Sequence, residues 1–285
     1  MERSKKKFKK SQNQASNHTQ EPSEERPKML KTGLWVERSL SHTMNRVRMK
    51  NKKSLTRMKI NITGAQNKQV IRQLHWLRNI KCLRSLTLDV EYYSLSSDTA
   101  MISAFIKRLK GLKTLALKFL DSYKMTDSCV QELTSSLKSL KNLQCLCFYL
   151  TYCVKVTNQS IKSLTTSLRG MNNLRHLVIS LSGNRLINQQ FFPSFRTFLE
   201  KNQSLEALAL VFVDCSEVDA SESSPLPMSL RKARHLKDLA IGFKESNKIT
   251  DRTAALISKS IETLENPKRL RLWFTGCSRI DRKSN

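Results

Sequence analysis

Apolar residues recur along the chain in short stretches of the same pattern. LQCLCFYL at 143–150 and LRHLVISL at 174–181 place apolar side chains at the same four phases, although the residues between them differ. Aligned on the first position, successive stretches begin 29 residues apart once and then 31 residues apart five times. The fourth position is a leucine in all seven: Leu86, Leu115, Leu146, Leu177, Leu208, Leu239 and Leu270. Such regularity indicates an internal repeat.

Apolar residues at the fourth, sixth and eighth positions of each stretch alternate with other residues. This period of two is typical of a short strand with one buried face. The sixth position is Leu88, Leu117, Phe148, Ile179, Leu210, Ile241 and Leu272, and the eighth is Val90, Phe119, Leu150, Leu181, Phe212, Phe243 and Phe274. A weaker eighth unit begins at Leu55, so we expect about seven or eight strands.

Upstream of each strand the apolar spacing changes to that of a helix. Val130, Leu133, Leu137 and Leu140 follow one another in steps of three, four and three, which places them on one helical stripe. The pairs Thr126-Asp127, Thr157-Asn158 and Thr250-Asp251 precede such stripes, and we expect the Asx oxygen to accept from the first helical N–H groups. Each unit is therefore a strand, a turn, a capped helix and a return to the next parallel strand.

A further column of residues lies ten positions after the start of each stretch from Leu112 onward, whereas Tyr93 breaks the column in the shorter repeat that begins at Leu83. The column contains small side chains with a hydrogen-bonding head: Ser122, Cys153, Asn184, Cys215, Ser246 and Cys277. Side chains of this kind suit a stacked turn, where they can satisfy backbone groups buried between neighbouring units.

The repeat pattern is thus LxxLxLx and an apolar residue, then Cys, Asn or Ser, and then a Thr-Asx pair before a helix. This order resembles leucine-rich repeat proteins of the ribonuclease-inhibitor-like type. The Cys-x-x-apolar-Thr-Asx element is also similar to the cysteine-containing repeats of F-box substrate receptors. The resemblance covers residues 55–285, although the Cys/Asn/Ser position lies two places later than usual. It implies an α/β fold, a right-handed solenoid with a concave parallel sheet and convex helices, and macromolecular recognition more often than catalysis.

Residues between the buried columns should point into the concavity and form the partner-binding surface. We expect a small, fairly apolar floor between two basic ends, which suits an acidic protein partner. Acidic residues on this face are few, at Asp89, Glu206 and Asp238. The candidate contact residues are Arg84, Lys113, Lys118, Tyr149, Arg175, His176, Val178, Val211, Lys268, Arg269, Arg271 and Trp273. A charged residue on a sheet face is often only solvated, and Trp273 with Phe274 can instead close the array.

The charge of the chain is strongly positive. Fifty-one Lys and Arg against 23 Asp and Glu give +28, of which residues 1–60 carry +12, so basicity is not confined to one tail. Such a field attracts acidic proteins, nucleic acid or an anionic membrane. Nucleic acid is thus a possible partner through non-specific basic contacts, but no interleaved aromatic residues or RNA-reading motif support sequence-specific contact.

The N-terminal part of the chain lies before the repeats. Residues 1–30 are polar and carry SKKKFKK, which is compatible with a nuclear-import signal, an RNA or membrane contact, or a solubilising tail. Residues 31–54 hold an apolar stripe at helical spacing, which predicts a helix that caps the first repeat. A peptide that docks a partner through the same stripe is the alternative.

Motifs that would support catalysis or cofactor binding are missing from the sequence. Cys145 and Cys147 share a strand face, but neither a second pair nor a nearby His completes a tetrahedral metal site. Cys147 and His176 on adjacent strands could form a nucleophile and base, yet no orienting acid follows. There is no phosphate-binding loop, dinucleotide fingerprint or HExxH. We therefore expect no enzyme, no cofactor and no metal.

The remaining sequence features bear on the cellular setting. No apolar run reaches the roughly 18 residues that a membrane span needs, and the charged N-terminus lacks the apolar core of a secretory signal. Seven cysteines favour reduced thiols in the cytoplasm or nucleus. The expected function is a non-enzymatic scaffold or adaptor. The alternatives are a nucleic-acid-associated protein and a substrate receptor of a ubiquitin ligase, with 34–49 as its adaptor-binding helix.

Overall fold

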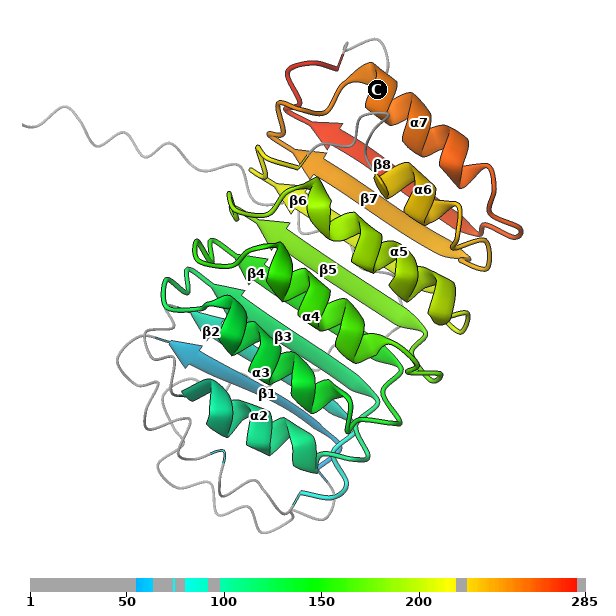
Figure 1. Cartoon of the computed structure of the whole chain (residues 1–285). Coiled ribbons are helices and arrows are strands. Elements are labelled where there is room, and N and C mark those ends of the chain that lie inside the picture. Colours follow the sequence, from blue (N-terminus) through cyan, green and yellow to red (C-terminus); the bar gives the residue numbers. More distant parts are fainter. Residues whose placement is uncertain (1–54, 64–73, 75–79, 92–97, 219–224, 281–285) are drawn as a thin grey trace, which may run out of the picture. The chain divides into compact units, whose positions relative to one another are not determined.

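The computed structural model describes residues 55–63, 74, 80–91, 98–218 and 225–280. The tail at 1–30 and the capping helix expected within 31–54 lie outside these residues. Over the described part the chain is an α/β fold built on one sheet of eight parallel strands, which is not closed (Figure 1). The strands are β1 Arg57–Thr63, β2 Ser85–Glu91, β3 Thr114–Leu120, β4 Cys145–Thr151, β5 His176–Ser182, β6 Ala207–Val213, β7 Asp238–Lys244 and β8 Arg269–Thr275.

The strands follow one another across the sheet in sequence order, β1 to β8. Their register confirms the repeat, because equivalent positions of successive units lie side by side. Leu146 of β4 aligns with Leu177 of β5, and Leu177 aligns with Leu208 of β6. The weaker unit at Leu55 forms β1, with Met58, Ile60 and Ile62 in the same phase as their neighbours in β2.

From β2 onward, helices return the chain from the end of one strand to the start of the next, and they lie on one face of the sheet (Figure 1). They are α2 Asp98–Arg108, α3 Asp127–Leu137, α4 Asn158–Leu168, the 3-10 turn η4 Gln189–Phe191 with α5 Phe192–Lys201, α6 Pro225–Leu230 and α7 Asp251–Ile261. The sheet face that points away from these helices is called the open face below.

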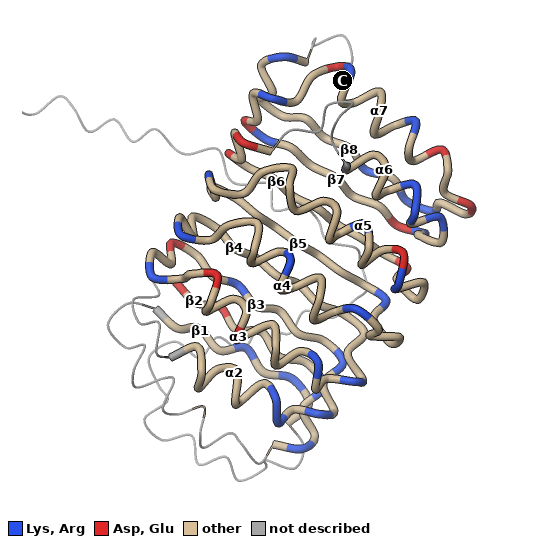
Figure 2. The backbone as a smooth tube through the Cα atoms, viewed as in Figure 1, with Lys and Arg blue, Asp and Glu red and all other residues tan. Residues whose placement is uncertain are grey.

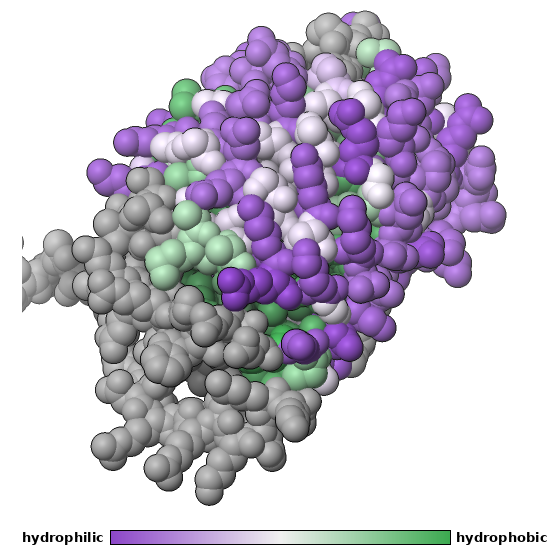
Figure 3. Space-filling model, turned by 60° about the horizontal axis from the view of Figure 1, so that its bottom comes forward, coloured by the Kyte–Doolittle hydropathy of each residue, from purple (hydrophilic) through white to green (hydrophobic). Residues whose placement is uncertain are grey.

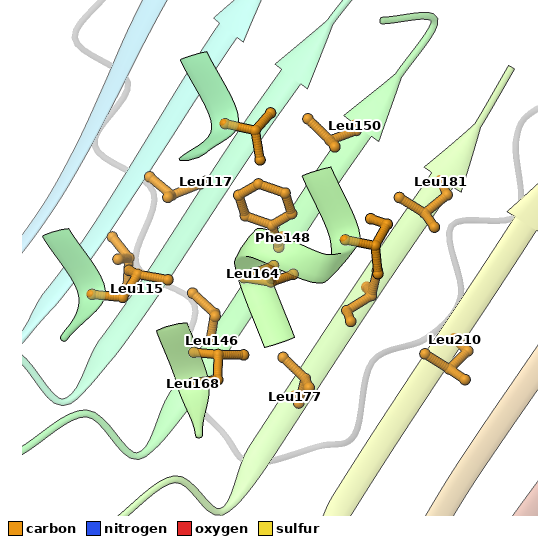
Figure 4. Close-up of a cluster of buried hydrophobic side chains, with 14 of the residues drawn as sticks. Leu115, Leu117, Leu146, Phe148, Leu150, Leu164, Leu168, Leu177, Leu181 and Leu210 are labelled. Carbon is orange, nitrogen blue, oxygen red and sulfur yellow. The ribbon is translucent and has the colours of Figure 1, made fainter. Parts of the chain in front are cut away.

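The core fills the space between the sheet and the helices. Leu146, Phe148 and Leu150 of β4 point toward Leu164 and Leu168 of α4, with the equivalent side chains of β3 and β5 beside them (Figure 4). All five of these side chains are fully buried. One unit cannot shield such a row alone, so each unit depends on its neighbours for burial. The predicted strand and helix columns are thus confirmed as one shared interior.

The column of small polar residues after each strand is buried, as expected. Asn184 donates from Nδ2 to the carbonyl of Leu150 in the preceding unit at 2.7 Å and accepts from the amide of Cys153 at 2.9 Å. Cys153 and Cys277 likewise donate their thiols to carbonyls of the preceding unit, at Phe119 and Phe243. These side chains therefore satisfy backbone groups between stacked turns, where an unpaired carbonyl would be costly.

The residue before each of these side chains adopts a left-handed backbone conformation. Asp121, Tyr152, Gly183, Asp214, Glu245 and Gly276 have φ between 48° and 67°. In all of them but Gly276, which follows the last strand, the amide continues the strand ladder, as when the amide of Tyr152 donates to the carbonyl of Ser182 at 2.8 Å. The sharp reversal at the end of every strand thus requires a conformation that glycine adopts at the lowest cost.

The helix starts differ from the sequence expectation. The threonine, not the following Asx residue, is the N-cap: Thr157 accepts from the amide of Gln159, and Thr250 accepts from the amide of Thr253. Asp127 instead reaches across to the next unit, where it accepts from the amide of Thr157 at 2.9 Å and from its hydroxyl at 2.6 Å. The Asx side chain lies one residue too far along the helix to cap it, so it joins neighbouring units.

Candidate partner-binding surface

The third position of each strand forms the middle row of the open face. From β3 to β7 this row holds only small or apolar residues: Ala116, Cys147, Val178, Ala209 and Ala240. Except for Cys147, which is buried, they are partly exposed. Among the described residues no helix or strand covers this face. Because these side chains are short, another chain could contact the middle of the open face closely without steric hindrance.

A second row, at the fifth strand position, brings Lys118 and Tyr149 together. The Lys118 ammonium lies 5.6 Å from the centre of the Tyr149 ring and 3.8 Å from the Asp89 carboxylate. Burial, with smaller contributions from the neighbouring cysteines, raises the pKa of Tyr149, so its ring stays neutral and can attract the cation. Lys118 is thus engaged with two groups of the same face, which makes it a less available partner contact than its sequence position predicted.

The cysteines of β4 lie differently from the nucleophile arrangement considered above. His176 aligns with Cys145, whereas Cys147 aligns with Val178. A hydrogen bond from Cys147 lowers the pKa of the Cys145 thiol, and the same bond together with burial raises that of Cys147. In the part of the chain that is described, no three or more His, Cys, Asp or Glu side chains gather as metal ligands would.

The last strand carries the second basic end of the open face. Arg269 donates from two nitrogens to both carboxylate oxygens of Asp238, at 2.9 and 2.7 Å. The ring of Trp273 covers the backbone of Gly242 on the neighbouring strand so closely that a β-carbon there would lie 1.9 Å from it. Arg269 and Trp273 are therefore tied to β7, and Arg271, between them, is exposed on the same face.

Four predicted basic contacts lie at the rim of the open face instead of within it. Arg84, Lys113, Arg175 and Lys268 each directly precede a strand, and all four are exposed. The same rim position is Gln144 before β4, Glu206 before β6 and Lys237 before β7. The carboxylate of Glu206 lies between two of the cations, 3.2 Å from Arg175 and 3.1 Å from Lys237. A hydrogen bond from Lys237 lowers the pKa of this carboxyl.

This rim belongs to a larger positive surface, the basic edge, made by the segments that lead into the strands. Its described segments are residues 80–84, 109–113, 138–144, 169–175, 202–206, 231–237 and 262–268. They hold thirteen Lys and Arg against three Asp and Glu. Lysines and arginines accordingly follow one another along this side of the molecule (Figure 2). The basic charge of the described chain is thus concentrated along one side of the sheet.

The opposite side of the sheet, the ladder edge, has no comparable excess. Its described segments after the strands are 121–126, 152–157, 183–188, 214–218, 245–250 and 276–280, with five Lys and Arg against four Asp and Glu. Figure 3 shows a surface that is mostly hydrophilic outside the grey atoms, with only small hydrophobic areas. The described segments of the two edges therefore differ clearly in net charge.

Reasoning from the sequence missed most of the basic edge. Lys110, Lys138, Lys141, Arg231 and Arg234 lie outside the strand pattern, so they were not candidates for a binding face. The signal was present in the repeat alignment, because counting charge separately for the segments before and after each strand shows the imbalance. The predicted residues Val178 and Val211 do lie on the open face, on adjacent strands.

None of the described helices has both the length and the apolar character that a membrane span requires. No protein-family model matches this chain, and a search of curated proteins finds no match either.

Proposed function

We propose that residues 55–280 form a leucine-rich repeat array of the ribonuclease-inhibitor-like type, wound as a right-handed solenoid. The support is the combination of a column that is leucine in every strand from β2 to β8, a return helix between successive strands from β2 onward, and a ladder of buried Cys, Asn and Ser side chains. In this arrangement the open face is the concave surface of the array.

We further propose that the chain is a non-enzymatic scaffold or adaptor of the cytoplasm or nucleus that binds an acidic protein on this face. The single observation that carries the proposal is the open face itself: a rigid row of small and apolar side chains, bordered by exposed cations at its rim. A preformed surface loses little conformational freedom on binding, which favours affinity. Cations at the rim steer an acidic partner and increase its association rate.

Glutamates placed in the centre of the open face would test this proposal. Full-length chain would be used to capture partners from nuclease-treated cell extract, and the acidic protein so identified would be purified for titration. We expect Val178→Glu with Val211→Glu to weaken that complex at least about tenfold, because both carboxylates would be buried opposite acidic groups. Met101→Glu with Val154→Glu, at two exposed apolar positions elsewhere, is the matched control and should change affinity little.

An unchanged affinity of the Val178→Glu/Val211→Glu variant for every partner would contradict binding at this face. A separate variant sharpens the role of the rim. Lys113→Glu with Lys268→Glu should mainly slow association, and the loss should shrink as salt is added, because screening weakens exposed charges beyond about 10 Å at 0.1 M.

The basic edge favours a second candidate function, the binding of nucleic acid through its phosphates. Thirteen cations along one side of the sheet supply the continuous positive surface that such binding needs. Affinity for a single-stranded RNA of about 20 nucleotides should then fall steeply with salt. Lys138→Glu with Lys141→Glu should reduce both the affinity and this slope, whereas Lys124→Glu with Lys155→Glu on the ladder edge should not. A flat salt dependence would reject this candidate.

A further inference from the structure

A pocket of about 540 Å³ opens on the helix side of the basic edge, near the C-terminal end of the array. It lies between α5, the segment that follows α6 and the segment that follows α7. Its lining comprises Arg196, Gln203, Met228, Arg231, Lys232, Arg234, His235 and Glu265. The volume is within the range of about 300–1,000 Å³ that is common for small-molecule sites.

The charges that line this pocket are unevenly compensated. Arg196 and Lys232 share the carboxylate of Glu200, at 3.2 and 3.8 Å. Arg231 and Arg234 are exposed, and among the described residues neither side chain has a hydrogen bond or ion pair. Glu265 is the one acid in the lining. Two guanidinium groups therefore face the pocket without a counter-charge, and a guanidinium binds phosphate oxygens well because its N–H groups form a planar fork.

The ordinary explanation for cations after a helix does not account for these arginines. Lys and Arg often follow a helix because they offset the partial negative charge of its last carbonyls. However, α6 spans only six residues, Pro225–Leu230, and its macrodipole is correspondingly short. No described carbonyl accepts a hydrogen bond from either side chain. Their charge is thus not used within the described part of the protein.

The remaining wall of the pocket is less polar. Met228 is 47% exposed, which leaves apolar surface at the pocket. Both ring nitrogens of His235 are shielded from solvent, and neither meets hydrogen-bond geometry with a described group. Burial lowers the pKa of His235, while the backbone of Asn202 and the carboxylate of Glu265 oppose this shift only in part. At neutral pH the imidazole of His235 is therefore an uncharged part of the pocket lining.

From this arrangement we propose that the pocket binds a small phosphorylated molecule. The phosphate lies against Arg231 and Arg234, and an organic part of the ligand covers Met228 and His235. Glu265 disfavours fully anionic ligands that would fill the whole pocket, which selects for a phosphate joined to an uncharged group. This site lies on the helix side of the molecule and goes beyond binding of a protein on the open face.

Calorimetric titration of the full chain with three probes tests this assignment. Pyrophosphate supplies the anion alone, adenosine 5′-monophosphate supplies the anion with an uncharged aromatic base, and adenosine lacks the anion. We expect saturable one-to-one binding of pyrophosphate and of the monophosphate and no binding of adenosine. Met228→Ser should weaken the monophosphate several-fold and leave pyrophosphate unchanged, since only the ring would contact that side chain.

Charge variants separate this pocket from the general positive field. Arg231→Gln with Arg234→Gln should weaken both phosphates at least about tenfold, because each lost guanidinium removes a charge-assisted hydrogen-bond pair. Lys138→Gln with Lys141→Gln removes the same charge from the basic edge away from the pocket and should change affinity less than about twofold. Thermal unfolding of both variants checks that they remain folded.

Two outcomes would overturn the proposal: no saturable binding of adenosine 5′-monophosphate at millimolar concentration, or equal weakening by the two pairs of substitutions. Because these titrations use small molecules, they remain informative if the open face binds no protein. Conversely, loss of a protein partner in Val178→Glu/Val211→Glu leaves the pocket unaffected.

Discussion

The basic edge and the ladder edge of the sheet differ in the burial and charge of their side chains, although the same repeat forms both. On the ladder edge, each unit from β3 to β8 places a left-handed residue and then a buried Cys, Asn or Ser whose side chain satisfies a backbone group. On the basic edge, most side chains are exposed, and Lys or Arg residues outnumber acids by thirteen to three. One edge is therefore held together by buried polar side chains, while the other places exposed charge between its buried leucines.

The largest expected effect comes from removing a buried hydrogen-bonding side chain from the ladder edge. Asn184→Leu should destabilise the protein by about 3–5 kcal/mol, because it leaves the Leu150 carbonyl and the Cys153 amide unpaired in the interior. The counterpart on the basic edge is Asn142→Leu. Its side chain donates to the carbonyl of Lys110 at 3.0 Å, but it is exposed, so water can replace that bond.

Urea unfolding of both variants measures the difference. We expect Asn142→Leu to cost less than about 1 kcal/mol. Similar losses at the two positions would show that the edges are equally constrained, against the contrast drawn above.

A glycine on each edge provides a second comparison of intermediate size. Gly183 and Gly170 both have positive φ, at 67° and 77°. A β-carbon at Gly183 would lie 2.2 Å from the Tyr152 ring, whereas one at Gly170 would meet nothing within 4 Å. Gly183→Ala should therefore cost about 2–3 kcal/mol and Gly170→Ala only the backbone strain of about 1 kcal/mol.

Combining Gly183→Ala with Tyr152→Ala separates the clash from the strain. If the clash explains the excess, the alanine at 183 should cost only about 1 kcal/mol in that background, as a double-mutant cycle would show. An undiminished cost would assign the whole effect to the backbone.

The smallest expected effect concerns the pH dependence of Asp127. Burial, the largest influence, raises its pKa, but hydrogen bonds from Ser160 and Thr157 together outweigh it and lower the pKa below the usual value. The bound carboxylate thus adds stability at pH values above about 4, and this contribution disappears as pH falls through the lowered pKa.

Asp127→Asn copies the next unit, where Asn158 makes a similar bridge by accepting from the amide of Asn188 at 2.9 Å. We expect the variant to lose about 0.5–1 kcal/mol near pH 6 and to approach the parent protein near pH 2. Chemical denaturation at several pH values measures this convergence. A constant difference between the two proteins at all pH values would show that ionisation of Asp127 contributes nothing.

The repeat pattern of the sequence predicted the strands and the helix faces because burial leaves a period that can be read directly. Leu146, Leu177 and Leu208 align as expected, and the Cys, Asn and Ser ladder makes the expected backbone contacts. The role of Asp127 could not be read in the same way, since its partner Thr157 is 30 residues away and the helix start suggested a local cap.

The candidate contact residues were harder to rank for a related reason. Alternation indicates which side chains share a face, but it does not say which of them bind one another. Lys118, Arg175 and Arg269 each pair with an acid one strand away, so they offer less free charge than their positions suggested. Arg231 and Arg234 lie in a segment without periodicity, and only the folded structure brings them to the pocket with Arg196.

The buried cysteines of the ladder edge can report on the opening of the repeat array. Burial raises the pKa of the Cys153 and Cys215 thiols to about 12, so at neutral pH they are protonated and enclosed. An alkylating reagent can reach them only when adjoining units separate, and modification at each position then records how often that junction opens. The rates at which these cysteines are modified would therefore show which junction between units opens first.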